Sequence, residues 1–137
     1  FHFLLPVTLL NRRHLKAFII SVFKREKRPL RDLNIIFCND QYLLELNRQF
    51  LNHDYYTDIL SFPLSHKNQP LIAEIYISVD RVRENAHLSK FSFKQELHRV
   101  IFHGVLHFCG FNDKSKNDIS KMRSEEDKLL TTYFESF

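Results

Sequence analysis

The stretch from His98 to Cys109 restricts the folds open to this chain more than any other part of the sequence. It is mostly apolar, yet histidines occupy positions 98, 103 and 107. A helix of this composition must be buried over most of its surface, and a buried imidazole needs a polar partner or a metal ion. We therefore expect a central, largely buried helix that ends at about Cys109.

The spacing of two of these histidines predicts a metal site. His103 and His107 are four residues apart, so they lie on one face of a helix. Gly110 follows, and glycine readily adopts the left-handed conformation that ends a helix. The chain can then turn back and bring Asp113 toward both imidazoles. His103, His107 and Asp113 are thus candidate ligands of a zinc ion, with a fourth position open to water or substrate.

Other interpretations of this pattern remain open. Paired histidines at this spacing also occur in structural helices that bind no metal. The same offsets occur in the long zinc-peptidase signature, which requires a glutamate directly after the first histidine as general base. This chain has Gly104 at that position. The metal-binding pattern is therefore present without the base that a peptidase needs.

Four stretches of the chain resemble the YbeY family of bacterial rRNA maturation factors, which are metal-dependent single-strand endoribonucleases. Residues 103–113 resemble the family pattern His-Gly-x-Leu-His-x-x-Gly-Tyr-Asp-His. Residues 54–63 are similar to Asp-x-Pro-Thr-Asp-Val-Leu-Ser-Phe-Pro, and residues 47–50 and 74–78 match shorter family segments. Together the four stretches span most of residues 47–113 in the family's order.

The chain departs from the family at two functional positions. Asp113 stands where the family has its third histidine ligand, and aspartate is also a competent zinc ligand. Leu51 stands where an arginine commonly follows the family's tyrosine. If that arginine holds a phosphate in relatives, its role here is vacant or passes to a neighbour such as Arg48.

The resemblance implies one domain over residues 1–137 that hydrolyses single-stranded RNA with one zinc ion per chain. The implied substrate is ribosomal RNA, and ribosomal proteins or assembly factors are further candidate partners. No general base can be identified, because Asp54 and Asp58 are candidates by residue type alone, and the favoured role of Asp58 is to cap or brace its loop. Two other classes remain open: a zinc peptidase-like hydrolase, and a non-catalytic ribosome-associated factor with a structural zinc.

The basic residues of the chain are unevenly distributed. The net charge is +4, yet between residues 12 and 31 eight basic residues accompany one acidic residue, Glu26. Such a segment attracts phosphate backbones, although a solvated helix face is an alternative. The resemblance favours RNA, and the candidate RNA contacts in this segment are Lys24, Arg25, Lys27 and Arg28.

Hydrophobic periodicity and turn residues predict the secondary structure. Helices are expected at residues 12–27, 40–50, 80–88, 92–109 and 117–134. Strands are expected at residues 1–5, 33–38, 59–64 and 72–79. This order predicts an α+β fold with one mixed sheet of about four strands, flanked by helices, and a metal site on the central helix and the following loop.

Several single residues carry further expectations. Asn11, Asp40 and Asp80 are candidate helix N-caps. Glu96, seven residues before His103, is a candidate hydrogen-bond acceptor for a ligand imidazole, with a surface position as the alternative.

The two cysteines and the lengths of the apolar runs indicate in which cellular compartment the protein lies. Cys38 and Cys109 both lie in apolar runs, and we expect buried free thiols, as in a reducing cytoplasm. No apolar run approaches the ~20 residues of a membrane span, and the first ten residues lack the charge order of a signal peptide. We therefore expect a cytoplasmic protein that does not enter the membrane.

Overall fold

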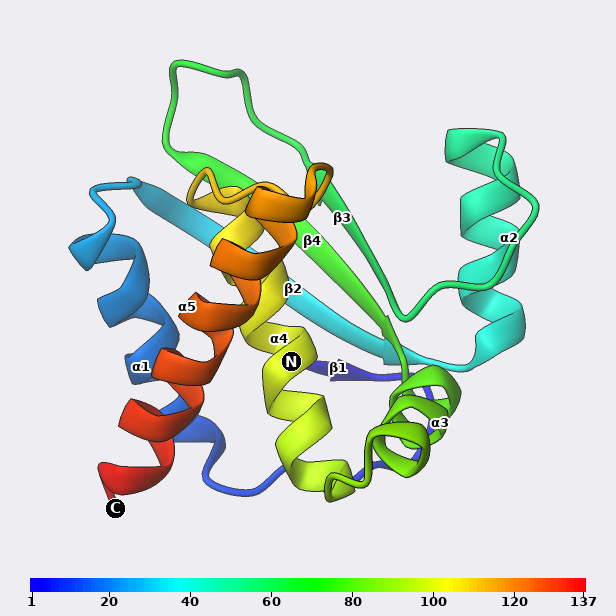
Figure 1. Ribbon diagram of the computed structural model, residues 1–137. Coiled ribbons are helices and arrows are strands. Elements are labelled where there is room, and N and C mark those ends of the chain that lie inside the picture. Colours follow the sequence, from blue (N-terminus) through cyan, green and yellow to red (C-terminus); the bar gives the residue numbers. More distant parts are fainter.

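Four strands form one mixed sheet in the order β1-β2-β4-β3 (Figure 1). The computed structural model describes all residues from 1 to 137. The strands are β1 (His2–Phe3), β2 (Leu30–Cys38), β3 (Ile59–Pro63) and β4 (Leu71–Ser78). The β1–β2 and β2–β4 pairs are parallel, whereas β3 pairs with β4 in the antiparallel sense. The predicted mixed sheet of four strands is confirmed.

Five helices complete the fold, and all their ends lie within two residues of the predicted ones. They are α1 (Arg12–Arg25), α2 (Asp40–Leu51), α3 (Val79–Ser89), α4 (Phe93–Phe108) and α5 (Lys116–Glu135). Figure 1 shows α1, α4 and α5 on one side of the sheet and α2 apart from them. No helix has both the length and the apolar character needed to span a membrane.

Alternation along the strands explains why helices cover both faces of the sheet. In β4, Ile75 and Ile77 face the main core with α4, and Tyr76 between them contacts the small cluster under α2. Successive side chains of a strand point to opposite faces, so the mostly apolar run of β4 fits a strand with helices on both sides. The α+β prediction therefore holds, with unequal cover on the two faces.

The cap predictions were wrong for three helices. Asn11 has a left-handed conformation and makes no side-chain cap. Asn39, not Asp40, caps α2, and Ser78, not Asp80, caps α3. The carboxylate of Asp40 instead accepts a hydrogen bond from the Ser78 hydroxyl at 2.6 Å, so it ties α2 to the start of α3.

Both cysteines are free thiols, as expected. Cys38 is fully buried, and burial raises the pKa of its thiol to about 12. Cys109 is half-buried rather than buried, and burial raises its pKa to about 11. Neither thiol is activated for nucleophilic chemistry, because the thiolate is the reactive form.

Helix α4 lies very close to the sheet at Gly104. A Cβ added there would be 2.9 Å from Cδ1 of both Ile59 and Ile75, closer than side-chain carbons normally pack. The residue after His103 therefore faces β3 and β4, and the close approach fixes the height of α4 above the sheet. It also positions His103, the residue before Gly104, which lines the neighbouring cleft.

We expect Gly104→Leu to lower the free energy of unfolding by about 1–3 kcal/mol, because overpacking forces a well-packed core apart. Gly104→Ala should cost less, since only the mobile ends of two isoleucines must move and alanine favours helix by ~1 kcal/mol over glycine. Chemical denaturation of both variants measures the difference. Equal stability of the leucine variant and the parent protein would contradict this account of the α4 packing.

Candidate active site

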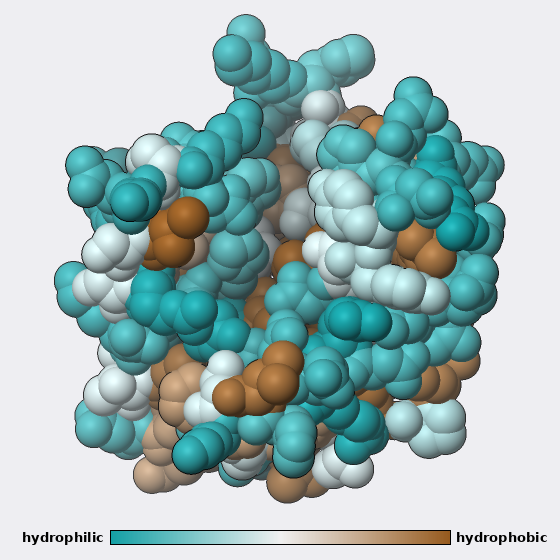
Figure 2. Space-filling model, turned by 45° about the vertical axis from the view of Figure 1, so that its right-hand side comes forward, coloured by the Kyte–Doolittle hydropathy of each residue, from teal (hydrophilic) through white to brown (hydrophobic).

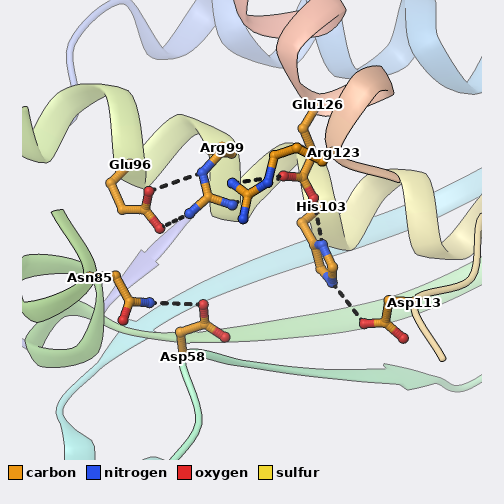
Figure 3. Close-up of polar contacts among 8 residues, drawn as sticks. All are labelled: Asp58, Asn85, Glu96, Arg99, His103, Asp113, Arg123 and Glu126. Atoms are coloured by element: carbon orange, nitrogen blue, oxygen red, sulfur yellow. Dashed lines mark hydrogen bonds and ion pairs between the residues drawn. The ribbon is translucent and has the colours of Figure 1, made fainter. Parts of the chain in front are cut away.

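His103 is held between two carboxylates from different parts of the chain (Figure 3). Its Nδ1 lies 2.7 Å from Oε2 of Glu126 on α5, and its Nε2 lies 3.3 Å from Oδ2 of Asp113. An ionised carboxylate can only accept a hydrogen bond, so Nδ1 donates to Glu126. The Nε2 atom is then the ring nitrogen that faces Asp113.

The charges around His103 favour a cation at Nε2. Burial by itself lowers the pKa of His103, but the hydrogen bond to Glu126 and the charges of Glu126, Asp113 and Asp58 outweigh it. The net pKa is therefore raised above the usual value. The same negative potential that favours a proton at this position also favours a metal cation.

The turn after α4 brings Asp113 back to His103, as the sequence predicted. Helix α4 ends at Phe108, and Gly110 has a φ of +102°, a conformation that glycine adopts readily. Because the chain reverses at this glycine, the Asp113 side chain reaches the imidazole of His103 from the following loop (Figure 3).

His107 does not join this pair in the structure. It is exposed on the last turn of α4 and makes no hydrogen bond or ion pair with His103 or Asp113. No group of three histidine, cysteine, aspartate or glutamate side chains is close enough to hold a metal ion. The three-ligand site of His103, His107 and Asp113 therefore stays a prediction, of which the His103–Asp113 pair is formed.

The third histidine of this stretch has a structural role. His98 is buried, and its ring stacks on Tyr133 while Nδ1 donates to the Lys94 carbonyl at 2.7 Å. Burial lowers the pKa of His98, so it stays neutral in the core. The three histidines thus divide into a core residue, a residue of the site and an exposed residue.

Glu126 is the functional residue that the sequence analysis missed. Glu96 was a candidate acceptor for a ligand imidazole, with a surface position as the alternative, and both were wrong: its carboxylate is fully buried and pairs with Arg99. Arg99 also donates to Oε1 of Glu126 at 3.1 Å. A signal was present, because Glu126 lies within an apolar stripe of α5 between Met122 and Leu129, where a charged residue needs a partner.

A cleft of about 520 Å³ opens beside His103, between the start of β3 and helices α3, α4 and α5. The molecular face shown in Figure 2 is hollowed in its middle, with hydrophobic residues at the bottom of the hollow and hydrophilic ones around it. The polar residues that line the cleft are Thr57, Asp58, Asn85, Ser89, Arg99, His103, Asp113, Arg123 and Glu126.

The structure separates the two candidate general bases. Asp58 lines the cleft, and one of its carboxylate oxygens accepts a hydrogen bond from Asn85 at 3.2 Å. Asp54 lies outside the cleft and pairs with Arg48 at 2.5 Å. Arg48 also pairs with Glu45 at 3.0 Å and does not line the cleft.

The basic segment lies elsewhere on the molecule. Lys24, Lys27 and Arg28 line a second, larger cleft of about 740 Å³ between α1 and β2. The His103 cleft lies by β3, at the other edge of the sheet. Arg25 is not part of this lining and pairs with Glu26 at 3.3 Å. The larger cleft therefore contains cations but none of the residues around His103.

We expect Glu126→Ala to destabilise the protein by about 3–5 kcal/mol, because it leaves the half-buried Arg99 and His103 without their shared acceptor. Glu125→Ala is the matched control, because the partly exposed ion pair between Glu125 and Lys128 stabilises the fold by at most ~1 kcal/mol. Thermal and denaturant unfolding compare the two. A loss for Glu126→Ala no larger than that of the control would show that the buried network does not hold α5 to α4.

Comparison with known proteins places this chain in a family. The family model described as endoribonuclease YbeY matches residues 8–134. The endoribonuclease YbeY of Cytophaga hutchinsonii is 44% identical over 123 residues, which cover 90% of this chain and 86% of that protein. The endoribonuclease YbeY of Flavobacterium psychrophilum is 49% identical over 115 residues, which cover 84% and 81%.

The fold is also found among solved structures. The solution structure of a Thermotoga maritima protein is similar with a TM-score of 0.58 and 27% sequence identity, over 93% of this chain and 89% of that one. The similarities thus extend over most of each chain, and residues 8–134 of the family match contain the positions that line the His103 cleft. By its sequence and its fold, this chain belongs to the YbeY family of endoribonucleases.

Proposed function

We propose that this member of an endoribonuclease family cleaves single-stranded RNA in the His103 cleft with the help of a bound metal ion, in the maturation of ribosomal RNA. The observation that carries the proposal is the orientation of His103 between Glu126 and Asp113. Metal-ligating histidines commonly donate their other ring N–H to a carboxylate. Glu126 gives His103 this partner and leaves Nε2 free for a metal.

We assign one zinc ion to His103, His107 and Asp113. Two imidazoles and one carboxylate are a donor set typical of catalytic zinc. A divalent cation would also offset the carboxylates of Asp58, Asp113 and Glu126, which outnumber the two arginines of the cleft. When bound, such an ion would activate a water molecule and polarise a phosphoryl oxygen.

The remaining steps belong to the side chains of the cleft. Glu126 keeps the proton on Nδ1 of His103 and so fixes the direction of Nε2. Asp58 is the one carboxylate of the cleft without an ion pair to His103, and it accepts a hydrogen bond from Asn85. We assign to Asp58 the role of general base, which takes a proton from the attacking water.

The two other classes fit this arrangement less well. A zinc peptidase needs a glutamate at position 104 as general base, and this chain has a glycine there, packed against Ile59 and Ile75. A structural zinc is enclosed by four protein ligands, whereas a cleft of about 520 Å³ beside His103 leaves room for substrate. The free thiols of Cys38 and Cys109 favour a reducing compartment, and we assign the protein to the cytoplasm.

We expect His107→Ala to lower zinc content and abolish cleavage of single-stranded ribosomal RNA by the pure protein, while RNA binding persists. The reason is that the metal supplies the activated water, whereas basic side chains supply affinity. Zinc analysis, a cleavage assay and a binding titration on the same sample measure the three quantities. Asp113→His, which introduces the usual family ligand, should keep both metal and cleavage.

His87→Ala removes another exposed histidine, on α3, and should change none of these quantities. The wild-type sample must have confirmed metal occupancy and no trace of contaminating nuclease. If that sample leaves single-stranded ribosomal RNA intact with several divalent metals, the nuclease proposal fails and the binding-factor alternative replaces it.

RNA affinity should depend on the basic segment. We expect replacement of its four candidate residues by glutamine to weaken the binding of single-stranded RNA. The slope of log K against log salt concentration should also become shallower, by ~0.7 for each phosphate contact that is lost. The four residues are Lys24, Arg25, Lys27 and Arg28.

A matched control removes the same charge from other parts of the surface. Its four exposed lysines, also changed to glutamine, are Lys67, Lys90, Lys94 and Lys128. Equal losses of affinity and slope in the two variants would mean that net charge, and not the cleft between α1 and β2, attracts RNA.

A further inference from the structure

A phosphodiester that enters the His103 cleft meets three carboxylates and needs a cation to hold it. Two arginines line the cleft, and Arg99 is already occupied. Its guanidinium contacts both oxygens of Glu96 and donates to Oε1 of Glu126 at 3.1 Å. Its side chain is only 13% exposed. Arg99 therefore neutralises buried carboxylates and has little capacity left for a substrate.

Arg123 is different in every one of these respects. It extends from α5 and lines the cleft, and its side chain is 53% exposed (Figure 3). Its one ion pair is with Oε1 of Glu126 at 3.8 Å, which is beyond hydrogen-bond distance, and this oxygen already accepts from Arg99. The donors of the Arg123 guanidinium are thus free to bind an anion.

The other candidate cations do not reach the cleft. Arg48, which the sequence analysis considered for this role, is paired with Asp54 and Glu45 outside the cleft. Leu51, at the position of the family's arginine, carries no charge. The basic segment lines a different cleft, at the opposite edge of the sheet. Arg123 is the one cation of the His103 cleft that is not held in a close ion pair.

We propose that Arg123 binds the phosphate of the RNA strand at the position of cleavage, a role that rests on the proposed function of this cleft. The planar guanidinium fork can donate two parallel hydrogen bonds to the two non-bridging phosphate oxygens. It also places a positive charge among carboxylates that would otherwise repel the strand. Phosphate contacts position a nucleic acid without reading its bases, so Arg123 acts on strands of any sequence.

The test compares Arg123→Ala and Arg123→Lys with the metal-loaded parent protein. Charge-assisted hydrogen bonds of this kind correspond to a ~10- to 100-fold effect, so we expect Arg123→Ala to lower kcat/KM on single-stranded RNA by that factor. Arg123→Lys keeps the charge but loses the fork and should recover part of the loss. Zinc content and melting temperature should not change, because the side chain is exposed and makes no close contact.

Two matched variants locate the effect. Lys121→Gln removes an exposed cation from the same helix, outside the cleft, and should leave kcat/KM unchanged. Arg48→Ala tests the alternative phosphate ligand. If Arg48→Ala lowers kcat/KM and Arg123→Ala does not, Arg48 holds the phosphate and the proposal for Arg123 is overturned. Unchanged kcat/KM in all variants overturns it as well.

A binding measurement separates this proposal from the proposed function. A fluorescent single-stranded tetranucleotide with non-hydrolysable phosphate linkages, followed by anisotropy, reports on binding without any turnover. It should bind Arg123→Ala ~10-fold or more weakly than the parent protein, even if the parent cleaves nothing. Equal binding of the tetranucleotide to both proteins would overturn the role of Arg123, whereas absent cleavage with this difference preserved would overturn the nuclease activity alone.

Discussion

The carboxylate of Glu126 is the point on which the site depends. It is almost fully buried, and it accepts from Arg99 through one oxygen and from His103 through the other. A buried carboxylate is costly unless it is paired on all sides, and here both partners come from α4. The same interaction therefore closes the α4–α5 contact and sets the direction of the His103 ring. The contacts that hold α5 to α4 are therefore the same contacts that orient His103.

The two sides of α4 have different roles. One side is apolar and lies against β3 and β4, so closely that position 104 has no room for a Cβ in the present packing. The other side carries Arg99 and His103 into the network with Glu126 and toward the cleft (Figure 3). Packing on the sheet fixes the position of the helix, and Glu96 and Glu126 hold Arg99 and His103 on its other side. A site on such an element is more precise than one carried by loops alone.

Charge is also divided between two places. The His103 cleft contains three carboxylates and two arginines, whereas the cleft between α1 and β2 is lined by several lysines and arginines and one carboxylate, Asp32. None of the lining cations of the second cleft takes part in an ion pair. This division suits a protein in which one surface attracts an extended anionic strand and another holds a cation and a single phosphate.

The sequence by itself determined the elements, the mixed sheet and the importance of residues 103–113, because these follow from local periodicity, helix-ending glycine and family resemblance. It could also place Asp113 near His103, since the turn at Gly110 is a local event.

The sequence could not identify the partner of His103, because Glu126 is 23 residues away in sequence and meets the imidazole only when α5 packs on α4. Glu96 was the wrong candidate for a different reason: its seven-residue spacing fits the helix face, but its carboxylate pairs with Arg99, three residues along the same helix. Only the tertiary structure decided which arginine faces the cleft. Arg48 is paired outside it, whereas Arg123 lines it with its donors free. The reason is that helix packing, and not spacing along the chain, determines which charged side chains meet.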